Sequence, residues 1–257
     1  MIDRAMLCLF CHDRLPLLRV TLASLRPLPA WVTVHAHVDG AGPVADWIAA
    51  CPDIEHATVT PTARGSGYQR HKALDDFLAR PEYDGMVFCD SDIAVAPDTL
   101  EAMRDALEFW WAHDYPTGML CGGTQKLNDR RVRYRAGRSM VYDRGWEALM
   151  LLPRGPLEQV GNHFDARRRS GELAVQKNAL RYAGHARITQ REPLIQMQHM
   201  GAFMGGISAH AGVDALLMRD VAGAPINPRP DLIDFADWRE DPGAAADALT
   251  ASLSGVA

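Results

Sequence analysis

A short apolar run that stops at two closely spaced aspartates constrains this chain more than any other feature. The run from Gly85 to Cys89 ends at Asp90-Ser91-Asp92. Runs of this kind, with β-branched and aromatic members and with glycine and charge at their ends, are typical of central strands. Because carboxylates are not buried without partners, we expect both acids at the carboxyl end of the strand, where open α/β sheets bind ligands. Paired carboxylate oxygens there suit Mg²⁺ or Mn²⁺ carrying a diphosphate.

Strand-like and helix-like segments alternate ahead of this strand. The predicted strands cover 5–11, 31–38, 56–60 and 85–89, and the predicted helices between them cover 16–25, 44–51 and 69–79. Alternation of this kind predicts βαβ units and parallel strands. We therefore expect an α/β fold with a mostly parallel central sheet flanked by helices.

The pattern is less regular after Asp92. We predict helices at 97–111, 144–151 and 172–183, strands at 118–122, 131–136, 139–142 and 194–199, and loops at 153–169 and 201–212. Proline and acidic residues dominate from residue 222 onward, which favours a partly docked or flexible tail.

Composition excludes several classes of protein. Of the 257 residues, 47% are hydrophobic and 23% are charged, as in ordinary globular proteins. A net charge of −5 gives no overall attraction to nucleic acid or anionic membrane. No apolar run approaches the roughly 20 residues that span a bilayer. The chain starts without a signal-peptide pattern and has five cysteines, an odd number, so we expect a cytoplasmic protein with reduced thiols.

Several motifs occur in a characteristic order. Asp39-Gly40 ends the second strand, a glycine-bearing loop at 63–68 leads into a basic helix, and the Asp90-Ser91-Asp92 motif follows. The opening stretch 11–25 and the stretch 90–98 fit the same order. In this order the chain resembles the nucleotide-sugar-dependent glycosyltransferases of the GT-A fold, family 2 in particular. The resemblance covers about residues 6–100 well and 118–206 weakly.

The resemblance implies a GT-A (Rossmann-like) sandwich and a donor site. One domain would cover 1–221, with a nucleotide-binding half at 1–100 and an acceptor-side half at 101–221, followed by a tail at 222–257. The donor would be a nucleotide-diphosphate sugar, most simply a UDP-sugar. Asp39 would contact its base or ribose, and Asp92 with Asp90 would bind Mn²⁺ or Mg²⁺. The family also implies basic diphosphate contacts from Arg64, Arg70 and Lys72, and a metal ligand from His199 in the segment Gln196 to Gly201.

The acceptor half departs from the family pattern. Glu172 precedes a predicted helix where the family has an acidic pair, whose second member commonly deprotonates the acceptor in inverting enzymes. The second position here is Leu173. Glu172 or Asp165 would then be the base, or the enzyme would retain configuration and need none. Asn162 and His163 are candidate sugar or acceptor contacts.

A basic segment offers two interpretations. Arg130, Arg131, Arg133 and Arg135 lie close together, and alternation places three of them on one face of a strand. This face is either solvated or a contact for an anionic acceptor or nucleic acid. The acceptor would then be a glycan, a lipid-linked phosphate or a modified nucleic-acid base.

Two other functions compete with a transferase. A Mg²⁺-dependent phosphatase of the haloacid dehalogenase class would use Asp90 as its nucleophile, but that fold normally has the motif on its first strand. A non-catalytic protein that binds sugar nucleotides would need only the donor half, and Leu173 keeps this alternative open.

Overall fold

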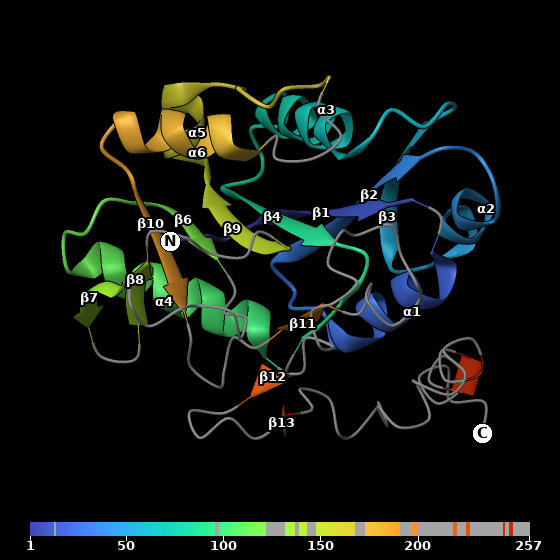
Figure 1. Cartoon of the computed structure of the whole chain (residues 1–257), viewed down its shortest axis with the longest axis horizontal. Coiled ribbons are helices and arrows are strands. Elements are labelled where there is room, and N and C mark those ends of the chain that lie inside the picture. The colour runs from blue at the N-terminus through green and yellow to red at the C-terminus, as the bar shows by residue number, and fades with distance from the viewer. Residues whose placement is uncertain are drawn as a thin grey trace.

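The computed structural model describes residues 1–12, 14–95, 98–121, 132–136, 139–142, 148–167, 173–190, 197–199, 218–219, 225–226, 244 and 247–248. In Figure 1 one large sheet crosses the molecule, with helices above and below it. The sheet has nine strands in the order β3-β2-β1-β4-β9-β6-β10-β8-β7. The α/β layering predicted from the sequence is therefore present.

The elements follow one another closely. The strands of the large sheet are β1 Ala5–Cys11, β2 Val32–Asp39, β3 Ile54–Thr60, β4 Gly85–Asp90, β6 Thr117–Cys121, β7 Val132–Ala136, β8 Ser139–Tyr142, β9 Leu149–Pro153 and β10 Ala186–Gln190. The short strands are β5 Ile93–Val95, β11 Met197–His199, β12 Met218–Arg219 and β13 Pro225–Ile226. The helices are α1 Leu15–Ser24, α2 Pro43–Ala50, α3 Ser66–Leu78, α4 Thr99–Ala112, α5 Arg154–Val160 and α6 Leu173–Tyr182.

Each face of the sheet has its own apolar core. On β1, Leu7 and Leu9 belong to the core that packs against α1, α2 and α4, whereas Cys8 and Phe10 belong to the core under α3, α5 and α6. The same division of helices is visible in Figure 1. Because both faces of β1 are covered, the strand is a continuous apolar run rather than an alternating one. This explains why its bounds follow directly from the sequence.

The two halves of the sheet differ in strand direction. Strands β3, β2, β1 and β4 are all parallel. Beyond β4, strand β9 runs antiparallel between β4 and β6, and β8 runs antiparallel to β10 and β7. Only β9 and β8 run against the other strands of this sheet, so the sheet is mostly parallel, as predicted.

Two predictions in the second half are wrong. The helix predicted at 144–151 is wrong at its end, because residues 149–153 form the strand β9. Residues 154–160, predicted as part of a loop, form α5. Each residue of β9 is buried, and periodicity cannot distinguish a fully buried strand from a buried helix. Strands β5 and β10 were not predicted. The predicted glycine-rich loop at 201–212 and most of the tail lie outside the described residues.

Candidate functional site

Parallel register brings the predicted acids to one edge of the sheet. Cys11 of β1 lies beside Val38 of β2, and Phe10 lies beside Asp90 of β4. The carboxyl ends of three strands therefore meet where Asp39 and Asp90 are located. The His12 ring is also there, with Nδ1 2.9 Å from the Asp39 carbonyl oxygen.

Asp39 shapes the loop that precedes α3. Its carboxylate accepts hydrogen bonds from the backbone N–H groups of Arg64 and Gly65, at 2.6 and 2.7 Å. The residue is only 4% exposed. Gly65 has φ of +92°, a conformation in which a side chain would be strained, so the loop depends on this glycine. Asp39 thus fixes the backbone at the start of α3.

Gln69 is a residue of this edge that the sequence did not single out. Its side-chain amide donates to the carbonyl oxygens of Cys11 and His37, at 2.9 and 2.6 Å, and the residue is buried. It ties α3 to the ends of β1 and β2. A polar residue on the same helical stripe as the buried Ala73 and Phe77 was the available signal.

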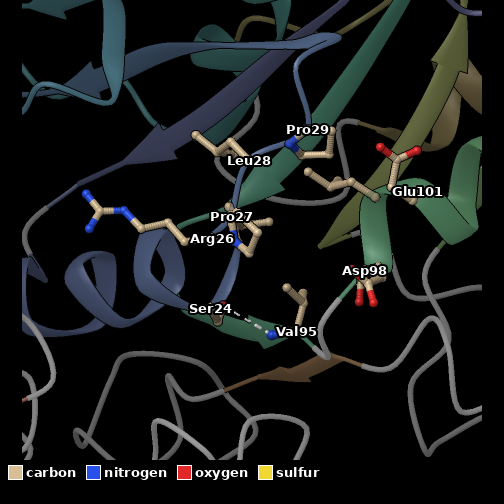
Figure 2. A pocket seen from close by; sticks show the side chains of 11 residues that line it. Ser24, Arg26, Pro27, Leu28, Pro29, Val95, Asp98 and Glu101 are labelled. Atoms are coloured by element: carbon tan, nitrogen blue, oxygen red, sulfur yellow. Dashed lines mark hydrogen bonds between the residues drawn. The ribbon is translucent and has the colours of Figure 1, made fainter. Parts of the chain in front are cut away.

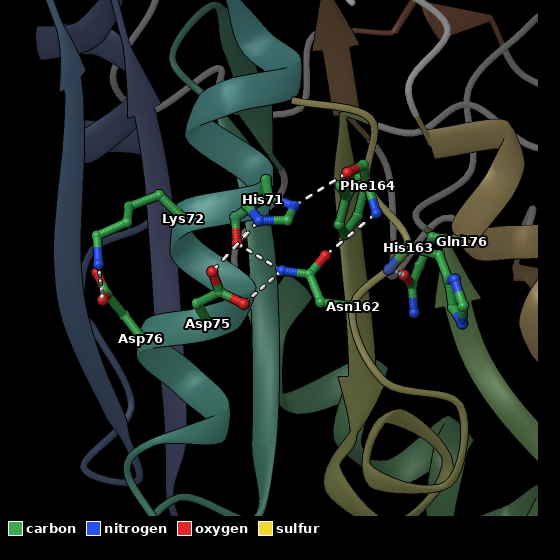
Figure 3. Close-up of polar contacts among 8 residues, drawn as sticks. All are labelled: His71, Lys72, Asp75, Asp76, Asn162, His163, Phe164 and Gln176. Atoms are coloured by element: carbon green, nitrogen blue, oxygen red, sulfur yellow. Dashed lines mark hydrogen bonds and ion pairs between the residues drawn. The ribbon is translucent and has the colours of Figure 1, made fainter. Parts of the chain in front are cut away.

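Arg70 and Lys72 have different surroundings although they share a helix. Arg70 donates to the Asp90 carboxylate at 2.8 Å and lies 5.5 Å from the centre of the Phe10 ring. The Lys72 side chain instead pairs with Asp76 at 2.9 Å, as Figure 3 shows, and this hydrogen bond raises the pKa of Lys72. The structure therefore brings Arg70 to the candidate site and not Lys72.

Asp92 has a different arginine beside it. Arg14, directly ahead of α1, donates to Asp92 Oδ2 at 3.2 Å. The third predicted basic contact, Arg64, has its guanidinium 4.3 Å from the centre of the Tyr68 ring. The two acids of the motif are thus each matched by a separate cation at the sheet edge.

The strand after the motif is fixed by α1 and β11. The backbone N–H groups of Ile93 and Val95 donate to Thr21 Oγ1 and Ser24 Oγ, each at 3.2 Å. On its other edge, β5 pairs with β11, and His199 lies opposite Ile93. The backbone of His199 is therefore one residue from the position opposite Asp92, although its side chain lies outside the described part of the structure.

The fit to a divalent cation rests on oxygen donors. Asp90 and Asp92 have side chains that are 28% and 16% exposed, so both are partly exposed to solvent. Among the described residues, no group of three or more histidine, cysteine or acidic side chains has metal-binding geometry. The two carboxylates suit Mg²⁺ or Mn²⁺, which take oxygen ligands and commonly retain water.

A side-chain network joins α3 to the loop between α5 and α6 (Figure 3). The Asn162 amide donates to the His71 carbonyl and to Asp75 Oδ1, at 2.8 and 2.7 Å, and its oxygen accepts the Phe164 N–H at 3.1 Å. The His71 ring lies with Nδ1 3.0 Å from the Phe164 carbonyl oxygen and Nε2 3.4 Å from Asp75. On the other side, buried Gln176 of α6 accepts from the His163 N–H at 2.7 Å.

This network holds the loop over the strand that ends at the motif. Phe164 is buried, and its ring lies 5.4 Å from that of Phe88, two residues before Asp90. Asp165 follows directly and accepts a hydrogen bond from the Arg167 N–H at 3.0 Å. Asn162 and His163 thus make contacts within the protein. Glu172 and the basic residues Arg130 and Arg131 lie outside the described residues, as do the side chains of Arg133 and Arg135.

Buried titratable groups lie beneath this edge. Burial lowers the pKa of His37 to about 4 and, with the neighbouring His56, that of His35 to about 3. Within the described part of the chain, neither ring nitrogen of His37 has a hydrogen-bond partner. Burial also raises the pKa of the Cys11 and Cys89 thiols, so these strand-end cysteines are neutral rather than nucleophilic.

A separate cavity of about 150 Å³ lies between the end of α1 and the start of α4 (Figure 2). Its lining residues are Ser24, Leu25, Arg26, Pro27, Leu28, Pro29, Val95, Asp98, Thr99, Leu100 and Glu101. None of them is a predicted site residue. None of the helices in the described part of the chain combines the length and apolar character needed to cross a bilayer.

Comparison with known proteins identifies the fold. No family model matches the sequence, and no curated protein matches it. A solved structure of the mannosyltransferase PcManGT from Pyrobaculum calidifontis, in complex with GDP-Man and Mn²⁺, is similar over 99% of this chain and 76% of that one, with 17% identity and a TM-score of 0.55. Residues 1–349 of S. aureus TarS, in complex with UDP-GlcNAc, are similar over 74% of this chain and 56% of that one, with 16% identity and a TM-score of 0.53. The GT-A fold predicted from the sequence is confirmed.

Proposed function

We propose that this chain is a glycosyltransferase that moves a sugar from a nucleotide-diphosphate donor to an acceptor, with a divalent cation held at Asp90 and Asp92. One observation supports this most: a parallel register gathers Asp39, Asp90 and Arg70 at one sheet edge. The proteins of similar fold include one solved with GDP-Man and Mn²⁺ and one solved with UDP-GlcNAc.

The donor half would bind the nucleotide through a preformed loop. Asp39 fixes the backbone of residues 64–65 through two hydrogen bonds, so the base or ribose would contact a backbone segment that is already held in place. Asp39 itself is 4% exposed, so its contact with the base or ribose would be made at the short exposed part of its carboxylate. Of the three predicted basic contacts, we assign the diphosphate to Arg70, which already lies 2.8 Å from Asp90.

The Asp90-Ser91-Asp92 motif would hold the cation that neutralises the diphosphate of the leaving nucleotide. When bound, Mn²⁺ or Mg²⁺ stabilises negative charge that develops on the diphosphate. Asp90 and Asp92 would bind the cation through oxygen or water, and we assign a third ligand to His199. The pairing of His199 with Ile93 supports this assignment, because it brings the two segments together from distant parts of the sequence.

The acceptor half would supply the base. We assign deprotonation of the acceptor hydroxyl to Glu172, which immediately precedes α6, with Asp165 as the alternative. Asp165 follows Phe164, which is buried against the strand of the motif, and the network around Asn162 fixes that position. Either carboxylate would hold the acceptor proton in the transition state. The acceptor itself would be a glycan, a lipid-linked phosphate or a nucleic-acid base.

Thermal unfolding with added ligands tests the proposal. We would record the melting temperature with UDP-GlcNAc or GDP-Man, each with and without Mn²⁺, and with Asp92→Asn beside the wild type. Stabilisation that needs both the nucleotide sugar and Mn²⁺, and that disappears in Asp92→Asn, is expected. Stabilisation by BeF₃⁻ with Mg²⁺ alone would instead favour the phosphatase. Nucleotide-sugar binding without donor hydrolysis would favour the non-catalytic protein.

A further inference from the structure

The ion pair between Arg14 and Asp92 engages one oxygen of a carboxylate that is proposed to bind the metal ion. Arg14 Nη1 lies 3.2 Å from Asp92 Oδ2. A guanidinium and a divalent cation at the same carboxylate repel each other, and both compete for the same lone pairs. The ion pair therefore competes with a metal ion for the negative charge of Asp92.

The two arginines of the motif differ in how firmly they are held. Arg70 is 11% exposed in its side chain, rests near the Phe10 ring, and belongs to a helix that Gln69 ties to two strands. The Arg14 side chain is 27% exposed, and Arg14 is the residue directly before α1. Of the two, Arg14 has more room to change its partner without disturbing a helix.

We propose that Arg14 and the divalent cation are alternative partners of Asp92, and that the donor diphosphate takes up the guanidinium that the cation displaces. This inference rests on the proposed function. Arginine binds phosphate oxygens through paired, charge-assisted hydrogen bonds, so the diphosphate compensates Arg14 for losing Asp92. The cation releases Arg14 from Asp92, and the diphosphate then binds Arg14. Conversely, a diphosphate that draws Arg14 away leaves Asp92 for the cation, so each ligand favours binding of the other.

Titration of Mn²⁺ by electron paramagnetic resonance, with and without UDP or GDP, measures this coupling directly. In Arg14→Gln the competitor is gone, so Mn²⁺ alone should bind about three- to tenfold more tightly than to the wild type. The gain in Mn²⁺ affinity that the nucleotide produces should shrink by about the same factor. Arg14→Lys keeps the charge but not the paired donors, so its Mn²⁺ affinity should stay near the wild type while the coupling falls.

Arg26→Gln is the matched control, because Arg26 pairs with Asp53 at a similar exposure, 32% and 24%, against 27% and 16% for Arg14 and Asp92. It should leave both quantities unchanged. If Arg14→Gln bound Mn²⁺ no more tightly than the wild type and the nucleotide's effect on Mn²⁺ affinity were unchanged, the inference would be overturned. Loss of Mn²⁺ binding in Asp92→Asn would in that case still support the metal site. Mn²⁺ binding that Asp92→Asn does not reduce, or no Mn²⁺ binding by the wild type, would overturn the proposed function as well. Circular dichroism confirms that each variant is folded.

Discussion

Asp39 and Asp90 owe their positions to the register of parallel strands, whereas Asp165 owes its position to side chains that reach its loop from another helix. In the first half, β1 fixes β2 and β4 on either side of it, residue by residue. In the second half, Asn162 and His71 fix a loop through four hydrogen-bonded contacts. Donor binding therefore depends on the strand register and acceptor chemistry on the side-chain network of the loop, so single variants should affect one without the other.

The largest effect is expected from the acceptor-side carboxylates. Glu172→Gln should slow nucleotide release from the donor by about 100-fold, because an amide cannot accept the acceptor proton. Nucleotide affinity in the presence of Mn²⁺ should change less than about twofold, since the donor half is untouched. If the rate of nucleotide release fell in Asp165→Asn and not in Glu172→Gln, Asp165 would be the base. Unchanged rates in both variants would contradict a base in this segment.

The next largest effect is expected to distinguish the two basic residues of α3, Arg70 and Lys72. Arg70→Gln should weaken nucleotide binding by about 10- to 100-fold, because charge-assisted hydrogen bonds contribute about 1.5–3 kcal/mol. Lys72→Ala should change it less than about twofold, because that side chain pairs with Asp76. Calorimetric titration with UDP and GDP at saturating Mn²⁺ measures both. Equal losses in the two variants would show that the contact in the free protein does not predict the diphosphate contact.

A smaller effect is expected when the loop is loosened. Asn162→Ala removes two donated hydrogen bonds and one accepted from Phe164. We expect nucleotide release to slow by about tenfold, because small displacements of reacting groups are costly, while nucleotide affinity is unchanged. Limited proteolysis should show faster cleavage near residues 161–167. Arg104→Ala breaks a surface ion pair with Glu101 on α4 and serves as the control. Parallel losses of rate and nucleotide affinity would mean that the two halves are not separable.

The smallest effect is a pH dependence of stability in the donor half. Burial lowers the pKa of His37 to about 4, below the roughly 6.5 of an unfolded histidine, so the unfolded chain takes up the proton first as the pH falls. Stability should therefore drop by about 0.7 kcal/mol between pH 7 and pH 6 from this residue, and further at lower pH. Urea unfolding at the two pH values measures it, with His37→Phe expected to remove that share. An unchanged drop in this variant would assign it to other groups.

Sequence reasoning succeeded where strands set the geometry. The continuous apolar runs of β1 and β4 predicted their bounds to within one residue and the edge at which Asp90 lies, because a strand buried on both faces is apolar throughout. It failed at β9, whose buried run resembles a helix segment, and at α5. These elements are specified by contacts with distant partners, which a local pattern does not contain.

The site followed the same division. Asp39, Asp90 and Arg70 were predicted as site residues from their places in the chain, and the structure brings them to one edge of the sheet, while their roles stay a prediction. Gln69 and Arg14 were not given roles, because a hydrogen bond to a strand end or an ion pair 78 residues away depends on packing. Lys72 was predicted from charge alone, and its i,i+4 pair with Asp76 is the local interaction that competes for it.

Release of nucleotide from a panel of donors tests the central claim most directly. The protein is incubated with UDP- and GDP-sugars, including UDP-GlcNAc and GDP-Man, with Mn²⁺ or with a chelator, and free UDP or GDP is quantified. The account predicts release from at least one donor, dependent on Mn²⁺, abolished in Asp92→Ala and retained in Asp105→Ala, whose carboxylate is exposed on α4. Absence of release from every donor, or release that neither the chelator nor Asp92→Ala reduces, would contradict it.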